Sequence, residues 1–573
     1  MVAASGRARG SKGNEDALHS TRAARRLAGI AAITAVLLAA CGGDDDDDDS
    51  AAGSAASAGT DAGSTPGGPT APGTAATPAD GTSAETTPAF ADGEPVEGGD
   101  LRVVYSSNPS SLDPVQGGSG GDHVSLYLFY DRLVNLDPID LTPLPGLATE
   151  WSSPDPQTLE LTLREGVTFH DGTPFDAAAV KANLDRGMTL ETSTVKADLS
   201  MIESVEVVDP THVRIALNRP DSSLVQILAD RPGMMVSPAA AADPEALGSH
   251  PVGTGPYTFG EWIPGDRLVA TKNAEYWQDG LPHLDSITVR YLTDQQTGLN
   301  ALTAGEADFH LRVRPESVQQ LEQVEGLNVV SSPSLWLEDC YFNFSQAPFD
   351  DVRVRRAVNL AIDRAAFTEG FTFGMGQPAV QVFPAGYWAH QPDLEEAYSF
   401  DPEQARELLA EAGYADGLAI KAIAGSASAE TLKSEIVQAM LADVGIDMTF
   451  EVMEVGPATS TFFEGLGHDL YCAGWSGRPD PSQTAGSLFS PGAFFNAGKY
   501  EAPGMVDALA AASYGADLEA RGASFHDVIA ISQQEAMFVP LAHVPDINGF
   551  RDGVGGFQPT LYGKPDLSFL WIE

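Results

Sequence analysis

The stretch 473–482, AGWSGRPDPS, carries residue types that suit recognition of a polar organic ligand. An exposed tryptophan offers stacking area, and nearby charged side chains supply directional hydrogen bonds. Ligand binding is therefore expected of four residues, Trp475, Ser476, Arg478 and Asp480. On this interpretation, alanine at position 475 or 478 weakens binding and leaves the melting temperature almost unchanged. The alternative is a surface turn in which Trp475 belongs to the core and Arg478 pairs with Asp480.

A second candidate is the glycine-rich stretch 117–121, GGSGG, which fits the pattern GxSxG. A nucleophile elbow needs a strand running into it, a helix behind it, and a histidine and an acid elsewhere in the chain. The preceding residues 107–115 are polar and contain two prolines. We therefore expect Gly118, Ser119 and Gly120 to form a ligand-contacting loop. An exported serine hydrolase that uses Ser119 remains the alternative.

The cysteines and histidines indicate neither a zinc site nor a catalytic metal. The sequence contains no HExxH, no Walker loop and no CxxC, and its eleven histidines are dispersed singly. We therefore expect no metal and no cofactor, and a nickel or metal-chelate binder is a further alternative. Cys340 and Cys472 each lie in a strand-like segment. They form either a disulfide, if the compartment is oxidising, or two buried thiols.

The bulk composition excludes some partners and favours more than one lobe. The chain has 573 residues, of which 32 are basic and 80 acidic, for a formal net charge of −48. So acidic a surface repels phosphate backbones, and nucleic-acid binding is not expected. A chain of this length is too long for one ordinary domain, so two or more compact parts are expected.

The N-terminus has the organisation of an export signal. A basic segment, 1–26, precedes an uncharged run at 27–40 that is shorter than the ~20 residues a membrane span needs. A buried helix is the alternative. The residues LAAC at 38–41 resemble the lipobox of bacterial lipoproteins. The resemblance implies that 1–40 is a signal peptide and that Cys41 is lipidated, which places the protein on the outer face of the cytoplasmic membrane.

The segment 41–97 is predicted to be a disordered tether. Six aspartates at 44–49 are followed by Ala, Gly, Ser, Thr and Pro with scattered acids, and no Lys or Arg occurs between 27 and 101. About 55 such residues span roughly 40 Å root-mean-square. A calcium site at the aspartates is the alternative, although the spacing of an EF-hand is absent.

From residue 98 onward, strand and helix patterns are mixed, which predicts an α/β body. Strands are expected at 101–105, 158–163, 205–208, 213–217, 257–262, 267–272, 448–453 and 469–474. Helices are expected at 123–134, after the cap Asp176, and at 352–362, 401–412, 430–444 and 518–535.

Several stretches resemble one known family in their order and spacing. They include GDLRVVYSSNPSSLDP at 99–114, LTLREGVTFHDGTPF at 161–175, PVGTGPY at 251–257, PFDDVRVRRAVNLAID at 348–363 and DPEQARELLAEAG at 401–413. Together they resemble the extracytoplasmic solute-binding proteins of ABC importers, in the peptide, nickel and opine-binding family (bacterial solute-binding protein family 5). The resemblance extends over roughly residues 98–573.

The resemblance implies a two-lobed fold like that of periplasmic binding proteins, type II, cluster C, with two hinge crossings. We expect the crossings near 312–315 and 537–545, a first lobe at 98–312 and 545–573, and a second lobe at 313–544. A ligand binds between the lobes and closes them. The implied partners are a peptide or other small organic solute and the permease and ATPase of an ABC importer, with the protein itself a monomer.

Two features of the dipeptide-binding relatives are missing from this sequence. In those relatives an aspartate three residues after the loop tryptophan takes the ligand amino group, and here that position is Arg478. Asp480, two residues later, is the nearest acidic substitute. The relatives also bind the ligand carboxylate with an arginine between a strand and the next helix, whereas the matching stretch 424–430, AGSASAE, has none. The expected solute is therefore peptide-like, with its length and charge open, and Arg478 is a candidate to bind an anionic group.

Overall fold

The computed structural model describes residues 93–573 except Gly118 and Ala516. The expected signal peptide, the lipidation of Cys41 and the expected tether up to residue 92 lie outside the described residues, as does the expected ligand contact of Gly118. Within 93–573, apart from those two positions, no helix is long and apolar enough to cross a membrane.

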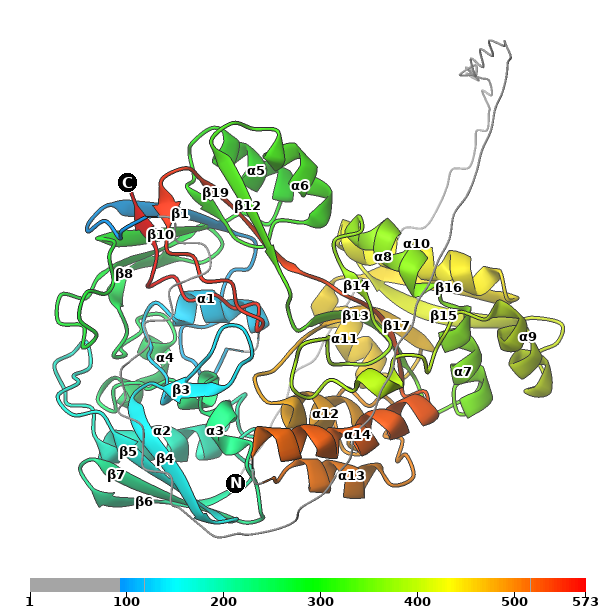
Figure 1. Cartoon of the computed structure of the whole chain (residues 1–573), viewed down its shortest axis with the longest axis horizontal. Coiled ribbons are helices and arrows are strands. Elements are labelled where there is room, and N and C mark those ends of the chain that lie inside the picture. The colour runs from blue at the N-terminus through cyan, green and yellow to red at the C-terminus, as the bar shows by residue number, and fades with distance from the viewer. Residues whose placement is uncertain (1–92, 118, 516) are drawn as a thin grey trace, which may run out of the picture. The chain divides into compact units, whose positions relative to one another are not determined.

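The first lobe is built on a seven-stranded sheet with the order β12-β19-β11-β1-β10-β9-β8 (Figure 1). Its strands are β1 (Asp100–Tyr105), β8 (Tyr257–Ile263), β9 (Arg267–Lys272), β10 (Ser286–Tyr291), β11 (Phe309–His310), β12 (Leu327–Ser332) and β19 (Asp546–Arg551). Strand β1 is central and parallel to both β10 and β11. Helices α5 (Gln295–Thr303) and α6 (Pro315–Glu322) belong to the same lobe and share a small apolar core with β19.

A four-stranded antiparallel sheet with the order β4-β5-β7-β6 extends the first lobe. Its strands are β4 (Ala148–Asp155), β5 (Thr158–Leu163), β6 (Ile202–Asp209) and β7 (His212–Leu217), and α2 (Ala177–Thr189) packs against β6. Alternate residues of β5 are buried, as expected for a sheet with one face on a core. Short elements complete the lobe: α1 (His123–Leu126), β2 (Val134–Leu136), β3 (Pro143–Pro145), α3 (Leu224–Ile227), α4 (Pro244–Leu247), β20 (Val554–Gly555) and β21 (Trp571–Ile572).

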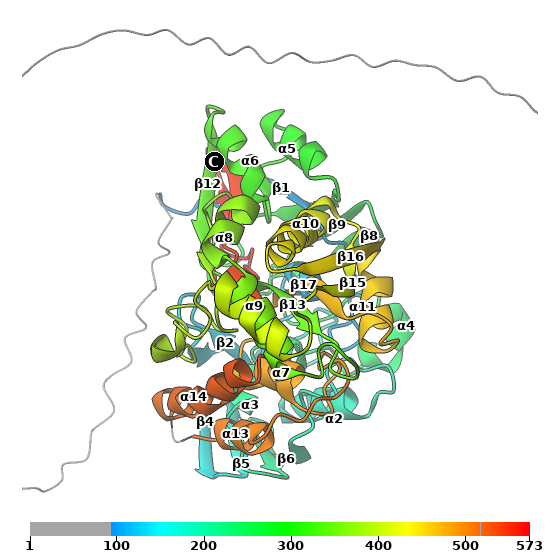
Figure 2. The same cartoon turned by 90° about the vertical axis from the view of Figure 1, so that its right-hand side faces the viewer.

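The second lobe is built on a six-stranded sheet with the order β14-β18-β13-β17-β15-β16. Its strands are β13 (Trp336–Phe342), β14 (Gln377–Pro378), β15 (Leu418–Gly425), β16 (Ile446–Met453), β17 (Leu470–Ser476) and β18 (Phe538–His543). The helices of this lobe are α7 (Val352–Ala361), α8 (Arg364–Thr372), α9 (Pro402–Glu411), α10 (Ser428–Ala442), α11 (Val455–Phe463), α12 (Pro481–Phe489), α13 (Met505–Ala512) and α14 (Leu518–Gln534). In Figure 2 the helix pair α7 and α9 lies side by side, in agreement with their contacts.

The chain passes between the two large sheets twice. It leaves the first lobe after β12, crosses at 333–335 into β13, and returns at 544–545 between β18 and β19. The two-lobed α/β fold expected from the sequence is confirmed. The first crossing, however, lies about twenty residues after the expected position at 312–315, because β12 pairs along its whole length with β19 of the first lobe. Below, the first lobe means 93–332 and 546–573, and the second lobe means 336–543.

Most expected elements are present within a few residues of their predicted bounds, but the helix expected at 123–134 is not. Helix α1 ends at Leu126. The Leu133 N–H instead donates to the Gly233 carbonyl at 2.9 Å, and Arg132 bridges to Met234. Pairing with a distant segment therefore replaces the helix that the apolar spacing favoured.

Candidate functional site: a cavity between the lobes

A cavity of about 500 Å³ lies between the lobes beside both crossings. Its volume falls within the range of small-molecule sites. The first lobe contributes residues from three segments, 312–316, 546–547 and 562–564, together with Ser106 and Gln295. The second lobe contributes Trp336, Glu338, Phe371, Phe373, Ser428, Ala429, Glu430, Leu432, Ser476 and Gly477. A ligand here would contact both lobes at once, which is the condition for ligand-driven closure.

Two arginines line the first-lobe side of the cavity. The backbone N–H of Arg312, which has a left-handed φ of 55°, donates to Asn548 Oδ1 at 3.1 Å. Its Nη2 donates to the Gly563 carbonyl at 2.9 Å, and the Asp546 carboxylate is 4.0 Å from its Nε. Arg314 Nη1 reaches across the lobes and donates to Ser428 Oγ at 3.1 Å. Both guanidinium groups therefore keep donor capacity for an anionic ligand.

The third basic residue of this side is Lys564, which is only 3 % exposed. Its Nζ donates to the Tyr562 hydroxyl at 2.6 Å and lies 3.8 Å from the centre of that ring. Among the described residues, no carboxylate lies within ion-pair distance of Nζ. Burial lowers the pKa of Lys564 well below its usual value, although Asp230 opposes this shift.

The second-lobe side is acidic. Lys433 is fully buried, and its Nζ donates to Glu338 Oε2 at 2.5 Å and lies 2.8 Å from Glu430 Oε2. Trp336 Nε1 donates to the other Glu338 oxygen at 2.8 Å. Two carboxylates therefore share one buried cation. Burial, together with the charge of Glu430, raises the pKa of Glu338 despite the attraction of Lys433.

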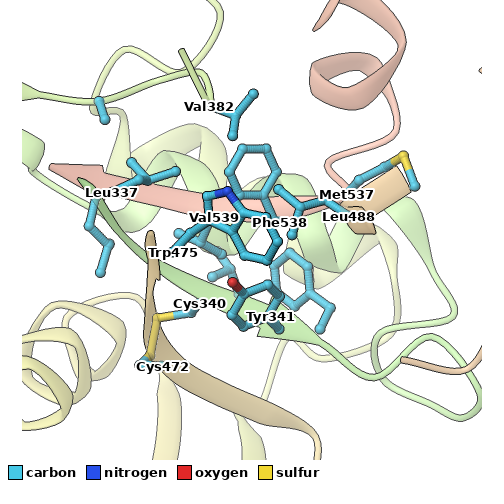
Figure 3. Packing of buried hydrophobic residues seen from close by; sticks show 14 of the residues in the cluster. Leu337, Cys340, Tyr341, Val382, Cys472, Trp475, Leu488, Met537, Phe538 and Val539 are labelled. Carbon is cyan, nitrogen blue, oxygen red and sulfur yellow. A yellow bond between two sulfur atoms is a disulfide. The ribbon is translucent and has the colours of Figure 1, made fainter. Parts of the chain in front are cut away.

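Trp475 lies in the core of the second lobe. It is 4 % exposed and packs within the main apolar cluster, with Phe495 edge-on at 5.1 Å between ring centres. Its Nε1 donates to Thr484 Oγ1 at 3.3 Å. Figure 3 shows the indole among Val382, Phe538 and Leu488. The structure therefore agrees with the alternative in which this tryptophan is a core residue.

The two charged residues of the same loop do not pair with each other. Asp480 is fully buried, and both of its carboxylate oxygens accept hydrogen bonds from Arg521. It is therefore not available to replace the missing aspartate at a ligand amino group. Arg478 is half-buried; its Nη1 donates to the Ser476 carbonyl at 3.3 Å, and its guanidinium lies 5.4 Å from the centre of the Trp475 ring.

Ser476 and the glycine loop are brought together where the lobes meet. Ser476 lines the cavity, and a Cβ placed on Gly120 would lie 3.0 Å from Ser476 Oγ. The Ser119 hydroxyl accepts a hydrogen bond from the Gly121 N–H at 3.1 Å. His123 is directed to other partners, the Gly120 carbonyl at 3.1 Å and the Asp230 carboxylate at 2.5 Å. The loop therefore lies next to Ser476 without lining the cavity itself. Among the described residues, no histidine is hydrogen-bonded to the Ser119 hydroxyl, as a nucleophilic serine would need.

Cys340 and Cys472 form a disulfide with an S–S distance of 1.98 Å. They stand opposite each other on the paired strands β13 and β17 (Figure 3). Of the two alternatives for these cysteines, the structure has the disulfide. Across the described residues, no group of three or more His, Cys, Asp or Glu side chains could hold a metal ion.

The main charged residues of the cavity, and the lysine buried behind it, were not singled out from the sequence: Arg312, Arg314, Glu338, Glu430 and Lys564, with Lys433. They come from segments up to about 250 residues apart, and none belongs to a local motif. One signal was available. The run RVR at 312–314 lies where a crossing between the lobes was expected, and both of its arginines line the cavity although the crossing itself is later.

The sequence of the chain matches the profile of "Bacterial extracellular solute-binding proteins, family 5 Middle" over residues 142–496. The chain belongs to this family. It is 35 % identical over 475 residues to the glutathione-binding protein GsiB of Salmonella paratyphi A, an alignment that covers 79 % of this chain and 91 % of GsiB. It is 34 % identical over 472 residues to GsiB of Escherichia coli O157:H7, with the same coverage. The chain is therefore a solute-binding protein.

Solved structures agree with this assignment. The ABC transporter-associated periplasmic binding protein DppA of Helicobacter pylori, in complex with the peptide STSA, has a TM-score of 0.75 and 26 % identity. That comparison covers 83 % of this chain and 99 % of DppA. AgaA of A. tumefaciens R10, in complex with agropinic acid, has a TM-score of 0.74 and 25 % identity, covering 83 % of this chain and 99 % of AgaA.

Proposed function

We propose that the protein captures a peptide-like solute in the cavity between its lobes and delivers it unchanged to the permease of an ABC importer. The observation that carries this proposal is the distribution of charge across the cavity. Arg312, Arg314 and Lys564 line the first-lobe side, where Asp546 and Glu316 lie 4.0 and 3.9 Å from the two arginines. Glu338 and Glu430, which share the buried Lys433 behind them, line the other side. A solute with an ammonium group and a carboxylate at opposite ends matches both sides.

The comparisons support the same class of solute. Among the proteins named above, GsiB is a glutathione-binding protein and DppA is in complex with a peptide, and both ligands are amide-linked molecules with free ammonium and carboxylate groups. AgaA, in complex with agropinic acid, shows that the family also takes other organic solutes. The arginine missing from 424–430 has a substitute on the opposite wall, because Arg314 contacts Ser428 within that region. We infer that Arg314 binds the solute carboxylate once the lobes close.

Isothermal titration calorimetry of the full chain with glutathione, Ser-Thr-Ser-Ala and its C-terminal amide tests this proposal. We expect saturable binding of at least one free acid, and weaker binding of the amide than of Ser-Thr-Ser-Ala. Arg314→Ala should weaken binding of the free acid at least about tenfold, since a charge-assisted hydrogen bond is lost. Arg214→Ala is the matched control, because Arg214 lies on the outer sheet surface and is paired with Glu160. Absence of binding by every probe would contradict the proposal.

We further propose that Cys41 anchors the protein to the outer face of the cytoplasmic membrane. The support is the lipobox-like LAAC sequence after a basic and an apolar segment. A thioether-linked diacylglycerol supplies the two acyl chains that stable anchoring needs. Cys41→Ser should move the exported protein from the detergent phase to the aqueous phase in Triton X-114 partitioning. Equal partitioning of both forms would contradict lipidation.

A further inference from the structure

Two large apolar side chains on the wall of the inter-lobe cavity are left partly exposed. Phe373 is 56 % exposed and Leu432 is 38 % exposed, and both line the cavity together with Phe371. They come from neighbouring elements, since Phe373 follows α8 and Leu432 lies near the start of α10. Helices α8 and α10 pack against each other and lie side by side in Figures 1 and 2. Partly exposed apolar residues that meet at a cavity indicate a binding surface.

The backbone at Phe373 adds a second, independent observation. Phe373 ends α8 in the left-handed region, with φ 54° and ψ 35°. Glycine is the residue that usually occupies this position, because a bulky side chain is strained there. The next residue, Gly374, is also left-handed, with φ 75°. Of the six left-handed non-glycine residues among the described residues, two, Arg312 and Phe373, line this cavity.

Phe371 provides a fixed surface between these apolar residues and the ionic group of the second lobe. Its ring is stacked on Phe367 at 5.3 Å between centres, and Lys433 Nζ lies 6.0 Å from its centre. Glu430 lines the cavity two residues before Leu432. The apolar surface is therefore continuous with the acidic side of the cavity, where the proposed solute places its ammonium group.

We propose that Phe371, Phe373 and Leu432 form an apolar subsite that selects peptide-like solutes with a large aliphatic or aromatic side chain. This inference rests on the proposed function, and it specifies which members of that class bind best. The terminal ammonium and carboxylate groups of a peptide interact with the charged residues of the cavity in the same way whatever the peptide's side chains are. Discrimination between peptides must then come from the apolar part, where each additional methylene removed from water strengthens binding.

The test is calorimetry of the full chain with four tripeptides: Ala-Ala-Ala, Leu-Ala-Ala, Ala-Leu-Ala and Ala-Ala-Leu. At least one leucine peptide should bind about fivefold or more tightly than Ala-Ala-Ala, since a leucine offers three more carbons to the subsite. Phe373→Gly, which removes the ring and relieves the left-handed strain, should reduce this preference below about twofold. Binding of Ala-Ala-Ala should change less than about twofold. Leu432→Ala should reduce the same preference.

Phe400→Ala is the matched control, because Phe400 is equally exposed in the second lobe and does not line this cavity. It should leave the preference for leucine intact. A preference that is absent in the unmodified protein, or that persists in both Phe373→Gly and Leu432→Ala, overturns the subsite while leaving the proposed function standing. Absence of binding by all four peptides overturns the subsite, and the proposed function still stands if glutathione or Ser-Thr-Ser-Ala binds. Thermal melts of each variant confirm that the exposed substitutions leave the fold unchanged.

Discussion

Asp480 and Arg521 form an ion pair that is almost completely buried. Arg521 Nη1 and Nη2 donate to the two carboxylate oxygens of Asp480 at 2.7 and 2.9 Å. Asp480 also begins α12, where its Oδ1 accepts from the Ser482 N–H. Arg521 belongs to α14, and its Nη1 also lies 3.3 Å from Gln226 Oε1 of the first lobe. One pair thus joins the loop after β17 to α14 and to the opposite lobe.

The first prediction is that Asp480→Ala destabilises the protein by about 3–5 kcal/mol, because it leaves the buried Arg521 guanidinium uncompensated. Urea unfolding followed by circular dichroism measures the change in the free energy of unfolding. The double variant Asp480→Leu/Arg521→Met should recover much of the loss, since no buried charge remains in it. If Asp480→Ala were as stable as the unmodified protein, water or another group would have to compensate the charge of Arg521.

Local sequence signals were sufficient for the elements whose partners are near in the chain. The β5 segment alternates, Asp176 caps α2 by accepting from the Ala179 N–H, and Asp401 caps α9 in the same way. Local sequence signals failed where a strand pairs with a segment that is distant in the chain. Strand β12 joins the first lobe because β19, more than 200 residues later, pairs with it. No periodicity within 313–332 carries that information.

The candidate site, too, could be predicted only in part from local sequence signals. Of the four ligand-binding residues predicted in 473–482, only Ser476 lines the cavity, and it approaches Gly120. The direction of the side chains in this stretch could not be read from the sequence. Residues of a strand alternate between faces, and which face carries Trp475 depends on the register of β17 with β13.

The second prediction follows from the burial of Trp475. Trp475→Ala should cost about 3–5 kcal/mol of stability, because it opens a cavity in the core of the second lobe. This differs from the unchanged melting temperature expected from the sequence alone. Differential scanning calorimetry compares Trp475→Ala with Phe400→Ala, the truncation of an exposed aromatic side chain. The free energy of unfolding of Phe400→Ala should stay within about 0.5 kcal/mol of that of the unmodified protein. Equal melting temperatures for the two variants would contradict the buried position.

The third prediction concerns Asp339, which is fully buried on β13, close to the Tyr341 hydroxyl and with no basic side chain within ion-pair distance among the described residues. Burial raises the pKa of Asp339 well above its usual value, although Lys433 opposes the shift. The folded protein therefore keeps a proton that the unfolded chain loses above about pH 4. Stability from this group is present at low pH and falls as pH rises, by up to about 1.4 kcal/mol per pH unit.

Asp339→Asn removes this loss. The variant should therefore be as stable as the unmodified protein near pH 4 and progressively more stable than it between pH 5 and 8. Chemical denaturation at each pH gives the difference between the two free energies of unfolding, in which the other titrating groups cancel. Asp416→Asn, at an exposed position, is the control and should show a difference that is flat with pH. A flat difference for Asp339→Asn as well would mean that Asp339 is ionised in the folded protein.

The last prediction concerns proton uptake at Lys564. Because burial lowers the pKa of this lysine, a solute carboxylate that reaches it should raise the pKa and draw a proton from the buffer. Calorimetric titration with glutathione in buffers of different ionisation enthalpy measures the number of protons taken up, and we expect up to one per solute bound. Lys564→Met should abolish the uptake and weaken binding, whereas Lys181→Met, on the exposed surface of α2, should change neither. Uptake that persists in Lys564→Met would place the proton on another group and move the carboxylate away from this wall of the cavity.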